Sequence, residues 1–388
     1  MLNQLDALKQ EIIDLRRYFH MNPEVSFKEE KTAAYIAEYL GKLGNMEIRT
    51  NVGGNGIIAD IKGKEPGKMV ALRADFDALP LPDEKDVPYK SKVEGVMHAC
   101  GHDGHTASLL GIAKVLSQNT DAFKGTVRLI FQHAEESLPG GAIAMVEAGC
   151  MDGVDAVFGS HLNSQVPVGE FTYAHGPFMA SPDTFYLTIQ GKGGHGAAPH
   201  ETVDAIIVAA NAVIALQQIA SRKVNPLDPV VVTVGTFNAG QAMNIIADSC
   251  QISGTVRTFN NKLKEQVIEE MHRILKGTCE AFGATYKLDY IWGYPAVINE
   301  AKSTDLAVEN LSKLVDADKV CAVEPSMGGE DFAYFLQKAP GCYFNTGAGN
   351  VEKGIVYPHH HPKFDIDEDS LLYASKGLLA VALDYLSK

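Results

Sequence analysis

The side chains best suited to chemistry gather in a few short segments of the chain. These segments are Cys100–His102, the adjacent carboxylates Glu135 and Glu136, the single His161, and the histidine run His359–His361. Thiolate, imidazole and carboxylate together are the ligands that bind divalent transition metals such as zinc, manganese, cobalt or nickel. The residue types therefore predict a metal site.

The two adjacent glutamates could have different roles at such a site, one as a metal ligand and the other as a general base. One carboxylate can hold metal while its neighbour accepts a proton from metal-bound water, whose pKa a bound metal lowers from 15.7 to about 7. A glutamate that accepts this proton acts as a general base and completes the nucleophile. On residue type alone, either Glu135 or Glu136 could take either role.

A single cysteine or histidine is most often a structural residue, so the prediction depends on the joint placement of these groups. We interpret His20, His133, His175 and His272 as structural, and His105 as a residue that supports a ligand. Cys100 is expected just before a helix, whose dipole would favour the thiolate.

The elements expected around these segments bring several of them to one edge of a sheet. Strands are predicted at Gly56–Ile61, Met69–Leu72, Thr126–Phe131 and Ala156–Gly159, and helices at Thr106–Leu116 and Ala142–Ala148. Strands that alternate with helices predict an α/β layer with a largely parallel sheet. Glu135 and His161 come after two of these strands, at the carboxyl end where open α/β sheets bind ligands. Upstream, Ser26–Glu29 reads as a capping box that opens a helix ending near Gly44.

The pattern changes near Pro182. From Thr184 to Ile291 the order strand–helix–strand–strand–helix–strand fits a ferredoxin-like unit of about 110 residues. Helices resume after it and continue to the end of the sequence. We therefore expect a catalytic α/β domain in two pieces, 1–180 and 293–388, interrupted by an inserted α+β domain at 181–292.

Composition narrows the class of protein. The chain has 388 residues, a net charge of −14 and 46% hydrophobic residues. An acidic balance argues against a nucleic-acid binder, which needs a basic face. The apolar stretch Ala205–Ala220 is interrupted by polar residues and falls short of ~18 uninterrupted apolar residues, so we expect no membrane span. The six cysteines form no CxxC pair, which favours a reducing cytoplasm.

Six motifs that occur in order carry a family resemblance. They are Arg73–Pro80, His98–His105, Gln132–Glu136, Gly191–His200, Gly328–Phe332 and His360–Phe364. Together they resemble the dinuclear metallo-amidohydrolases typified by hippurate hydrolase, auxin-conjugate hydrolases and N-acetyldiaminopimelate deacetylase, within the aminoacylase/carboxypeptidase G superfamily. The resemblance extends over essentially the whole chain and implies a di-metal exopeptidase-like catalytic domain with an inserted lid domain.

The resemblance also assigns roles to single residues. It implies two divalent ions per subunit, Mn, Zn, Ni or Co, held by Cys100, His102, Glu136, His161 and His360. Cys100 would bridge the two metals and Glu135 would be the general base. Asp75 would orient a ligand from behind.

Three further residues of the implied site lie in the lid domain. His195 matches a histidine that stabilises the developing oxyanion, often in the site of a partner subunit. Asn244 and Arg257 match residues that contact the amide oxygen and the carboxylate of the substrate. The resemblance therefore implies a homodimer or higher homo-oligomer formed through the lid domain, with no nucleic-acid or membrane partner.

The predicted activity is hydrolysis of the amide bond of N-acyl amino acids, such as N-acetyl or benzoyl conjugates, by a metal-bound hydroxide with a glutamate base. An alternative in the same chemistry is a metallo-dipeptidase or aminopeptidase that acts on short peptides. A metal-free amidase with Cys100 as nucleophile is a different class, but a Cys-Gly-His pair seldom places nucleophile and base together. A non-catalytic metal-binding protein would have no need of Glu135.

Overall fold

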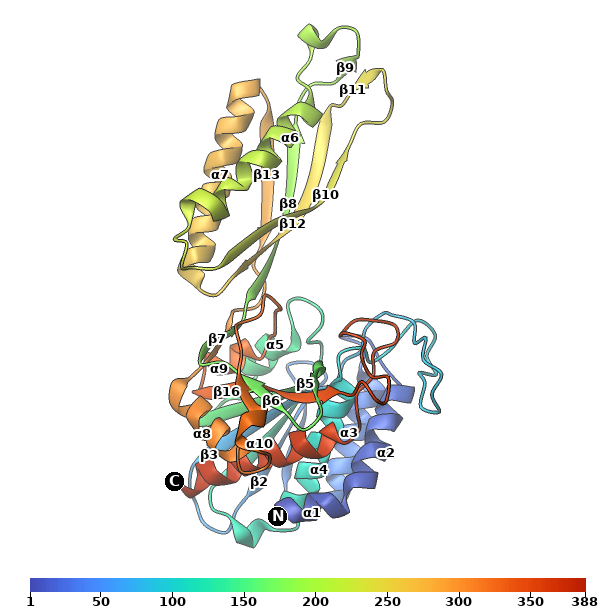
Figure 1. Ribbon diagram of the computed structural model, residues 1–388, viewed down its shortest axis with the longest axis vertical. Helices are drawn as coiled ribbons and strands as arrows, with labels where there is room; N and C mark the ends of the chain where they lie inside the picture. Colours follow the sequence, from blue (N-terminus) through green and yellow to red (C-terminus); the bar gives the residue numbers. More distant parts are fainter. The chain divides into compact units, whose positions relative to one another are not determined.

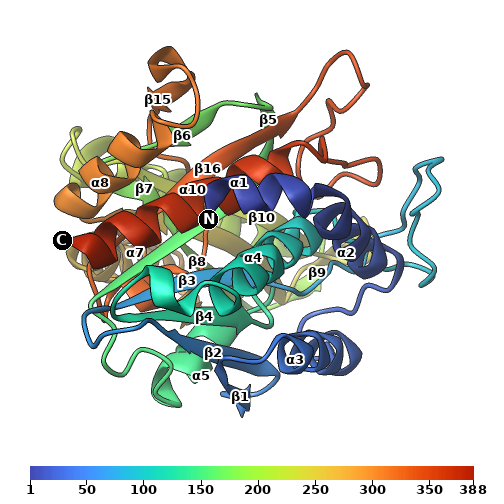
Figure 2. The same ribbon diagram turned by 90° about the horizontal axis from the view of Figure 1, so that it is seen from below.

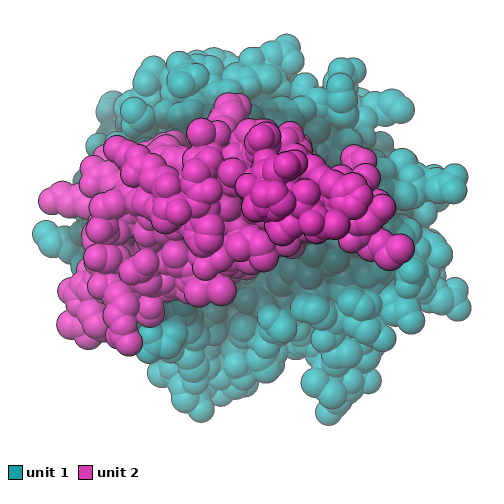
Figure 3. Space-filling model, turned by 90° about the horizontal axis from the view of Figure 1, so that it is seen from above, with its two compact units in different colours: residues 1–178, 298–325, 331–388 teal, residues 179–297, 326–330 magenta.

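In the computed structural model, which describes residues 1–388, the chain folds into two units. The first unit comprises Met1–Phe178, Ile298–Pro325 and Asp331–Lys388, and the second comprises Met179–Val297 and Ser326–Glu330 (Figure 3). Each unit has a hydrophobic core of its own. The second unit therefore consists of one long and one short segment of the chain, and the first unit consists of the three segments on either side of them.

A mixed sheet of eight strands forms the centre of the first unit (Figure 1). Its order is β1 (Glu47–Val52), β2 (Gly56–Lys62), β4 (Thr126–Gln132), β3 (Met69–Asp75), β5 (Ala156–Pro167), β16 (Gly341–Gly349), β6 (Phe171–Tyr173) and β15 (Val320–Ala322). The central strands β4, β3, β5 and β16 are parallel to one another, and antiparallel pairs lie toward the edges. The α/β fold with a mostly parallel centre is confirmed.

Helices cover this sheet because its central strands are apolar on both faces. The long helices α4 (His102–Ser117) and α10 (Ser370–Ser387) lie side by side against β3 (Figure 2). Helix α2 (Lys9–Met21) packs on α4, with α1 (Leu2–Ala7) and α3 (Glu30–Leu43) nearby. Helix α8 (Ala301–Leu311) contacts α10 and β16, and the short α5 (Gly141–Glu147) contacts α9 (Ala333–Leu336). Nearly every residue of α4 is buried, so its first turn is held rigidly at the centre of the unit.

The second unit has the predicted ferredoxin-like order. Its elements are β8 (Ser181–Gln190), α6 (Ala205–Leu216), β10 (Val230–Ala239), β12 (Ser249–Thr258), α7 (Asn261–Phe282) and β13 (Thr285–Ile291). The strands form an antiparallel sheet in the order β10-β12-β8-β13, and α6 and α7 pack together on it. A two-residue ladder joins β9 (Gly194–His195) to β11 (Ile245–Ile246), and β7 (Gly176–Met179) pairs with β14 (Val297–Asn299) where the chain passes between the units.

Helix α6 is unusually apolar for a helix of this kind. The stretch Ala205–Lys223 is long and apolar enough to count as a candidate membrane span by length and composition, with 33% of it buried. Val208 and Leu216 belong to the core of the unit, whereas Ile207 and Ile214 are 51% and 72% exposed. The helix therefore has one apolar face in the core and apolar side chains on the opposite face that the fold leaves open.

Three expectations about element boundaries are wrong. Helix α4 begins at His102, four residues earlier than expected, because Gly101 adopts the left-handed backbone (φ 91°) that starts it. His161 lies within β5 and not after it, because pairing with β16 extends that strand to Pro167. Ser26 does not cap α3, which starts at Glu30, because its hydroxyl donates to Asp77 Oδ2 at 2.7 Å instead.

Candidate metal centre

Neighbouring elements of the first unit position the predicted metal-binding side chains. Glu135 and Glu136 follow β4, His161 lies in β5, and β3 runs between these two strands. Because the three strands are parallel, their carboxyl ends meet at one edge of the sheet. Cys100 and His102 reach the same edge at the start of α4.

The structure brings the five predicted ligands together. Cys100 Sγ lies 3.5 Å from His161 Nε2, and Glu136 Oε1 lies 3.9 Å from His102 Nε2 and 3.3 Å from His360 Nε2. The donor atoms form two groups, Cys100–His102–His161 and Cys100–Glu136–His360, and within each group all atoms lie within 4.8 Å of one another. Cys100 is common to these two groups, and a further group joins His102 to Glu135 and Glu136, so these side chains could hold two neighbouring cations.

Unpaired buried atoms support a cation at this place. His102 Nε2 and Glu136 Oε1 are buried and make no hydrogen bond of regular geometry, although His360 Nε2 lies 3.3 Å from Glu136 Oε1. Buried polar atoms in folded proteins almost always have one, so such atoms that face each other point to a missing ligand. A sulfur, imidazole nitrogens and a carboxylate form a donor set that suits zinc and its neighbours. The residues present therefore fit a divalent metal pair.

Carboxylates dominate the electrostatics around the predicted ligands. Burial, followed by the charges of Glu136, Glu135 and Asp75, raises the pKa of the Cys100 thiol well above its usual range. Burial and the neighbouring carboxylates thus oppose the thiolate form that the α4 dipole is expected to favour. Burial opposes protonation of His102, but Asp75, Asp77 and Glu136 outweigh it and raise the pKa of this imidazole to about 10. The charged groups that act on Cys100 and His102 are carboxylates, so these surroundings favour a bound cation.

Of the histidine run, His360 alone reaches Glu136. Its backbone adopts a left-handed φ of 63°, and its N–H donates to Ala99 O at 2.8 Å, next to Cys100. His361 turns away, stacks on Tyr357 with ring centroids 4.5 Å apart, and accepts a hydrogen bond from Lys363 N. His359 packs against the rings of Phe364 and His161. The contact with Glu136 thus supports the predicted register.

Asp77 is a site residue that the sequence interpretation missed. Its Oδ1 atom accepts a hydrogen bond from His102 Nδ1 at 3.1 Å, which directs Nε2 of the same ring toward Cys100 and Glu136. Its Oδ2 atom accepts from Glu136 N at 3.0 Å. One buried carboxylate therefore orients two of the predicted ligands. Its place two residues after Asp75, at the end of a buried strand, was the available signal.

Asp75 lies close to one predicted ligand and is linked to the strand of another, since its Oδ2 atom is 3.6 Å from His102 Nε2 and its carboxylate contacts His105. Its carboxylate pairs with Arg73 Nη1 and accepts from His105 Nδ1, each at 2.6 Å. His105 Nε2 in turn accepts from Leu162 N at 2.9 Å, next to His161 in β5. Asp75 and His105 thus tie the first turn of α4 to the strand that carries His161, which agrees with the supporting role expected for His105.

Glu29 is a second residue that sequence reasoning placed elsewhere. It is fully buried, and its carboxylate accepts from Ala134 N at 2.8 Å and from Asn55 Nδ2 at 3.1 Å. Ala134 has a left-handed φ of 54°, a conformation that costs an alanine about 1–2 kcal/mol. Burial, together with the charge of Asp77, raises the pKa of Glu29 to about 7. Glu29 therefore holds the strained turn that presents Glu135 and Glu136, and it is not part of a capping box.

The three predicted substrate-contacting residues belong to the second unit. His195 and Asn244 are exposed and close to each other, because β9 pairs with β11 and Asn244 O accepts from Gly196 N at 2.8 Å. Arg257 lies near the other end of β12, half-buried, and donates from Nη1 to Asp183 O at 3.4 Å and to Thr255 Oγ1. The unit thus places two of the three at one tip and the third near its base.

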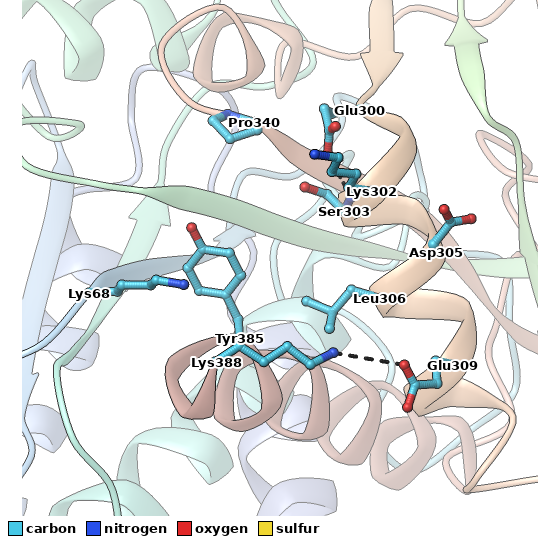
Figure 4. A pocket seen from close by; sticks show the side chains of 10 residues that line it. All are labelled: Lys68, Glu300, Lys302, Ser303, Asp305, Leu306, Glu309, Pro340, Tyr385 and Lys388. Carbon is cyan, nitrogen blue, oxygen red and sulfur yellow. Dashed lines mark hydrogen bonds and ion pairs between the residues drawn. The ribbon is translucent and has the colours of Figure 1, made fainter.

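A hollow elsewhere in the first unit carries none of this chemistry (Figure 4). It has a volume of about 540 Å³ and is lined by charged side chains around Leu306, Pro340 and Tyr385. Lys68 and Pro340 immediately precede β3 and β16, so the hollow lies at the amino ends of the parallel strands. It holds no histidine or cysteine and is at the opposite edge of the sheet from Cys100.

Comparison with known proteins identifies the family of the chain. Residues 71–384 match the model of peptidase family M20/M25/M40. The chain is 50% identical over 295 residues to an N-acyl-L-amino acid amidohydrolase of Geobacillus stearothermophilus, covering 76% of this chain and 80% of that one. It is 43% identical over 389 residues to thermostable carboxypeptidase 2 of Saccharolobus solfataricus, covering 100% and 98%.

A solved structure agrees with these relatives. The crystal structure of a dinuclear metal-binding peptidase of the M20 family from Bacillus subtilis superposes with a TM-score of 0.85 at 36% identity, covering 98% of this chain and 99% of that one. The family model, the relatives and this solved structure lead to the same conclusion: this chain is a hydrolase of the M20/M25/M40 peptidase family.

Proposed function

We propose that this chain hydrolyses the amide bond of N-acyl amino acids, with two divalent ions bound by Cys100, His102, Glu136, His161 and His360. The observation that carries the proposal is the pair of donor groups that share Cys100, with Glu135 directly beside them. The identity to an N-acyl-L-amino acid amidohydrolase supports this class of substrate. Zn, Mn, Ni and Co all suit the donor set.

When bound, the metals supply Lewis-acid activation of the scissile carbonyl and favour ionisation of water. Glu135 lies in a largely buried position, 6% exposed, one residue from the ligand Glu136. Its carboxylate accepts the proton of the attacking water and then returns it to the leaving amine, as a general base that becomes a general acid. Ala134 and Glu29 fix the turn that aims it.

The groups of the second unit recognise the substrate in this proposal. His195 donates a hydrogen bond to the developing oxyanion, a contact worth about 3–4 kcal/mol when it is preorganised. Asn244 donates to the amide oxygen. Arg257 uses Nη1 on Asp183 and Thr255, and the rest of its guanidinium can bind a carboxylate with two hydrogen bonds.

We further propose that the inserted domain, 181–292, is a lid that also forms a homodimer. Strand β10 is an edge of its sheet, and α6 presents Ile207 and Ile214 to solvent beside it. An open edge with an adjacent apolar helix face is suited to isologous pairing with a second copy. The six free cysteines support a reducing cytoplasm as the compartment.

A substrate screen tests the activity. The metal-loaded enzyme should release amino acid from N-acetyl, benzoyl or indole-acyl amino acids at least tenfold faster than it cleaves dipeptides, and removal of metal by a chelator should abolish both reactions. Readdition of Mn or Zn should restore them. Faster cleavage of peptides would favour the peptidase alternative, which the thermostable carboxypeptidase relative keeps open. Full activity of a verified metal-free preparation would reject the proposal.

A further inference from the structure

A buried arginine joins the two segments that carry the predicted ligands His102 and His360. Arg16 lies on α2, and its side chain is 0% exposed. Its Nε donates to Asp103 Oδ2 at 2.9 Å, and its Nη2 donates to Asp365 Oδ1 at 2.7 Å. Asp103 follows His102 in the first turn of α4, and Asp365 lies in the loop that carries His360. One guanidinium therefore spans both segments.

The loop of His360 depends on such anchors. The His360 side chain is 55% exposed, so its own packing restrains it little. The loop is attached through His360 N to Ala99 O, through Pro362 O to Glu84 N, and through Asp365. Of these attachments, only Asp365 connects the loop to the first turn of α4 through a side chain, because Arg16 contacts Asp103 as well.

The Asp103 side of the bridge is equally fixed. Asp103 Oδ2 also pairs with His20 Nδ1 at 2.7 Å, and Oδ1 accepts from Gly104 N at 3.0 Å. On the other side of the bridge, the Tyr89 hydroxyl donates to Asp365 Oδ2 at 2.8 Å. The guanidinium carbon of Arg16 lies over the Tyr89 ring, 4.8 Å from the ring centroid. A buried ion pair adds little net free energy of folding, because the cost of desolvating the two charges offsets their attraction. We therefore look for the role of this ion pair in the positions that it fixes.

We propose that Arg16 is a positioning residue of the metal centre: through Asp103 and Asp365 it sets the separation of His102 and His360, so that both donor groups around Cys100 can form at once. This inference rests on the proposed function, because it concerns the same pair of metals. Lysine cannot replace the fork of Arg16, since one ammonium does not match two carboxylates bidentately.

Titration of metal-free protein with Zn²⁺ tests this role without reference to turnover. Arg16→Lys and Asp365→Asn should each weaken one of two bound ions by about tenfold or more, the range found when residues behind ligands are changed. The other ion should change by less than about threefold. Because both variants break the same bridge, their effects should not add in the double variant. Arg128→Lys is the matched control, since Arg128 is a buried arginine of the first unit that pairs with both oxygens of Asp60 and touches neither Asp103 nor Asp365.

The outcomes separate this inference from the proposed function. Wild-type protein that binds fewer than two Zn²⁺ ions would reject the metal centre itself. Wild-type protein that binds two, with Asp365→Asn unchanged at both, would overturn the role of Arg16 alone. A loss equal for both ions in Arg16→Lys and Arg128→Lys would also overturn it, because that result indicates general destabilisation. If Arg16→Lys fails to fold, Asp365→Asn decides, since Asp365 lies in a loop and not in the hydrophobic core.

Discussion

At the residue scale, the proposed mechanism depends on two adjacent glutamates, Glu135 and Glu136, that contact different residues. Glu136 faces His102 and His360, and its backbone N–H is held by Asp77. Glu135 follows Ala134, whose left-handed backbone is fixed by Glu29. The two carboxylates therefore leave the same turn with separate supports, which allows one to bind metal and the other to move a proton.

Glu135→Gln should separate catalysis from metal binding. The amide keeps the shape of the side chain but cannot accept the proton, so turnover should fall by about 10²–10⁴-fold. Bound metal, measured by elemental analysis of the same sample, should stay near the wild-type amount. Glu136→Gln is the comparison, and it should lose metal as well as activity. Turnover of the metal-loaded Glu135→Gln protein within a few-fold of wild type would remove Glu135 from the role of base.

The sequence predicts the ligands better than the residues behind them. Cys100, His102 and the glutamate pair stand out because they lie next to predicted strands and helices at the end of the sheet where sites are built. Asp77, Glu29 and Arg16 are ordinary acidic and basic residues, and only the packing of distant segments shows what they hold. Burial converts them into specific supports, since a charged group inside the protein must have partners.

At the element scale, burial also decides which strands and helices could be predicted from the sequence. The strands β3 and β4 are apolar runs because helices cover both faces of the sheet, and they were predictable. The short strands β6 and β15 were not, because three residues contain no recognisable period. The start of α3 was misplaced because Ser26 and Glu29 bond to distant segments rather than to the helix.

Helix α6 offers a direct test of the proposed dimer. Ile214 is 72% exposed on the face of α6 away from its core, so Ile214→Glu should place a charge in an apolar interface between two copies. Sedimentation should show a dimer for wild type and a shift to monomer for the variant, with folding unchanged. Val351→Glu, at a position 82% exposed in the first unit, should leave the dimer intact. A wild-type monomer at tens of micromolar, or a variant that remains dimeric, would contradict this interface.

At the scale of the whole molecule, the two units divide the chemistry. All five predicted ligands and Glu135 lie in the first unit, whereas His195, Asn244 and Arg257 lie in the second. The cores of the units share no residue, so each can keep its own geometry. The alternation of strands and helices, followed by the ferredoxin-like pattern, made this organisation visible in the sequence. The brief return of Ser326–Glu330 to the second unit was not visible, because no periodicity marks a five-residue crossing.

In the proposed metal centre, one thiolate of the first unit is shared by two metal ions. Anomalous diffraction at the zinc edge, from crystals grown with Zn²⁺, measures this directly. We expect two peaks about 3.5–4 Å apart. Both should lie about 2.3 Å from Cys100 Sγ, the usual length of a zinc–sulfur bond. A single peak, or two peaks that do not share Cys100, would contradict it.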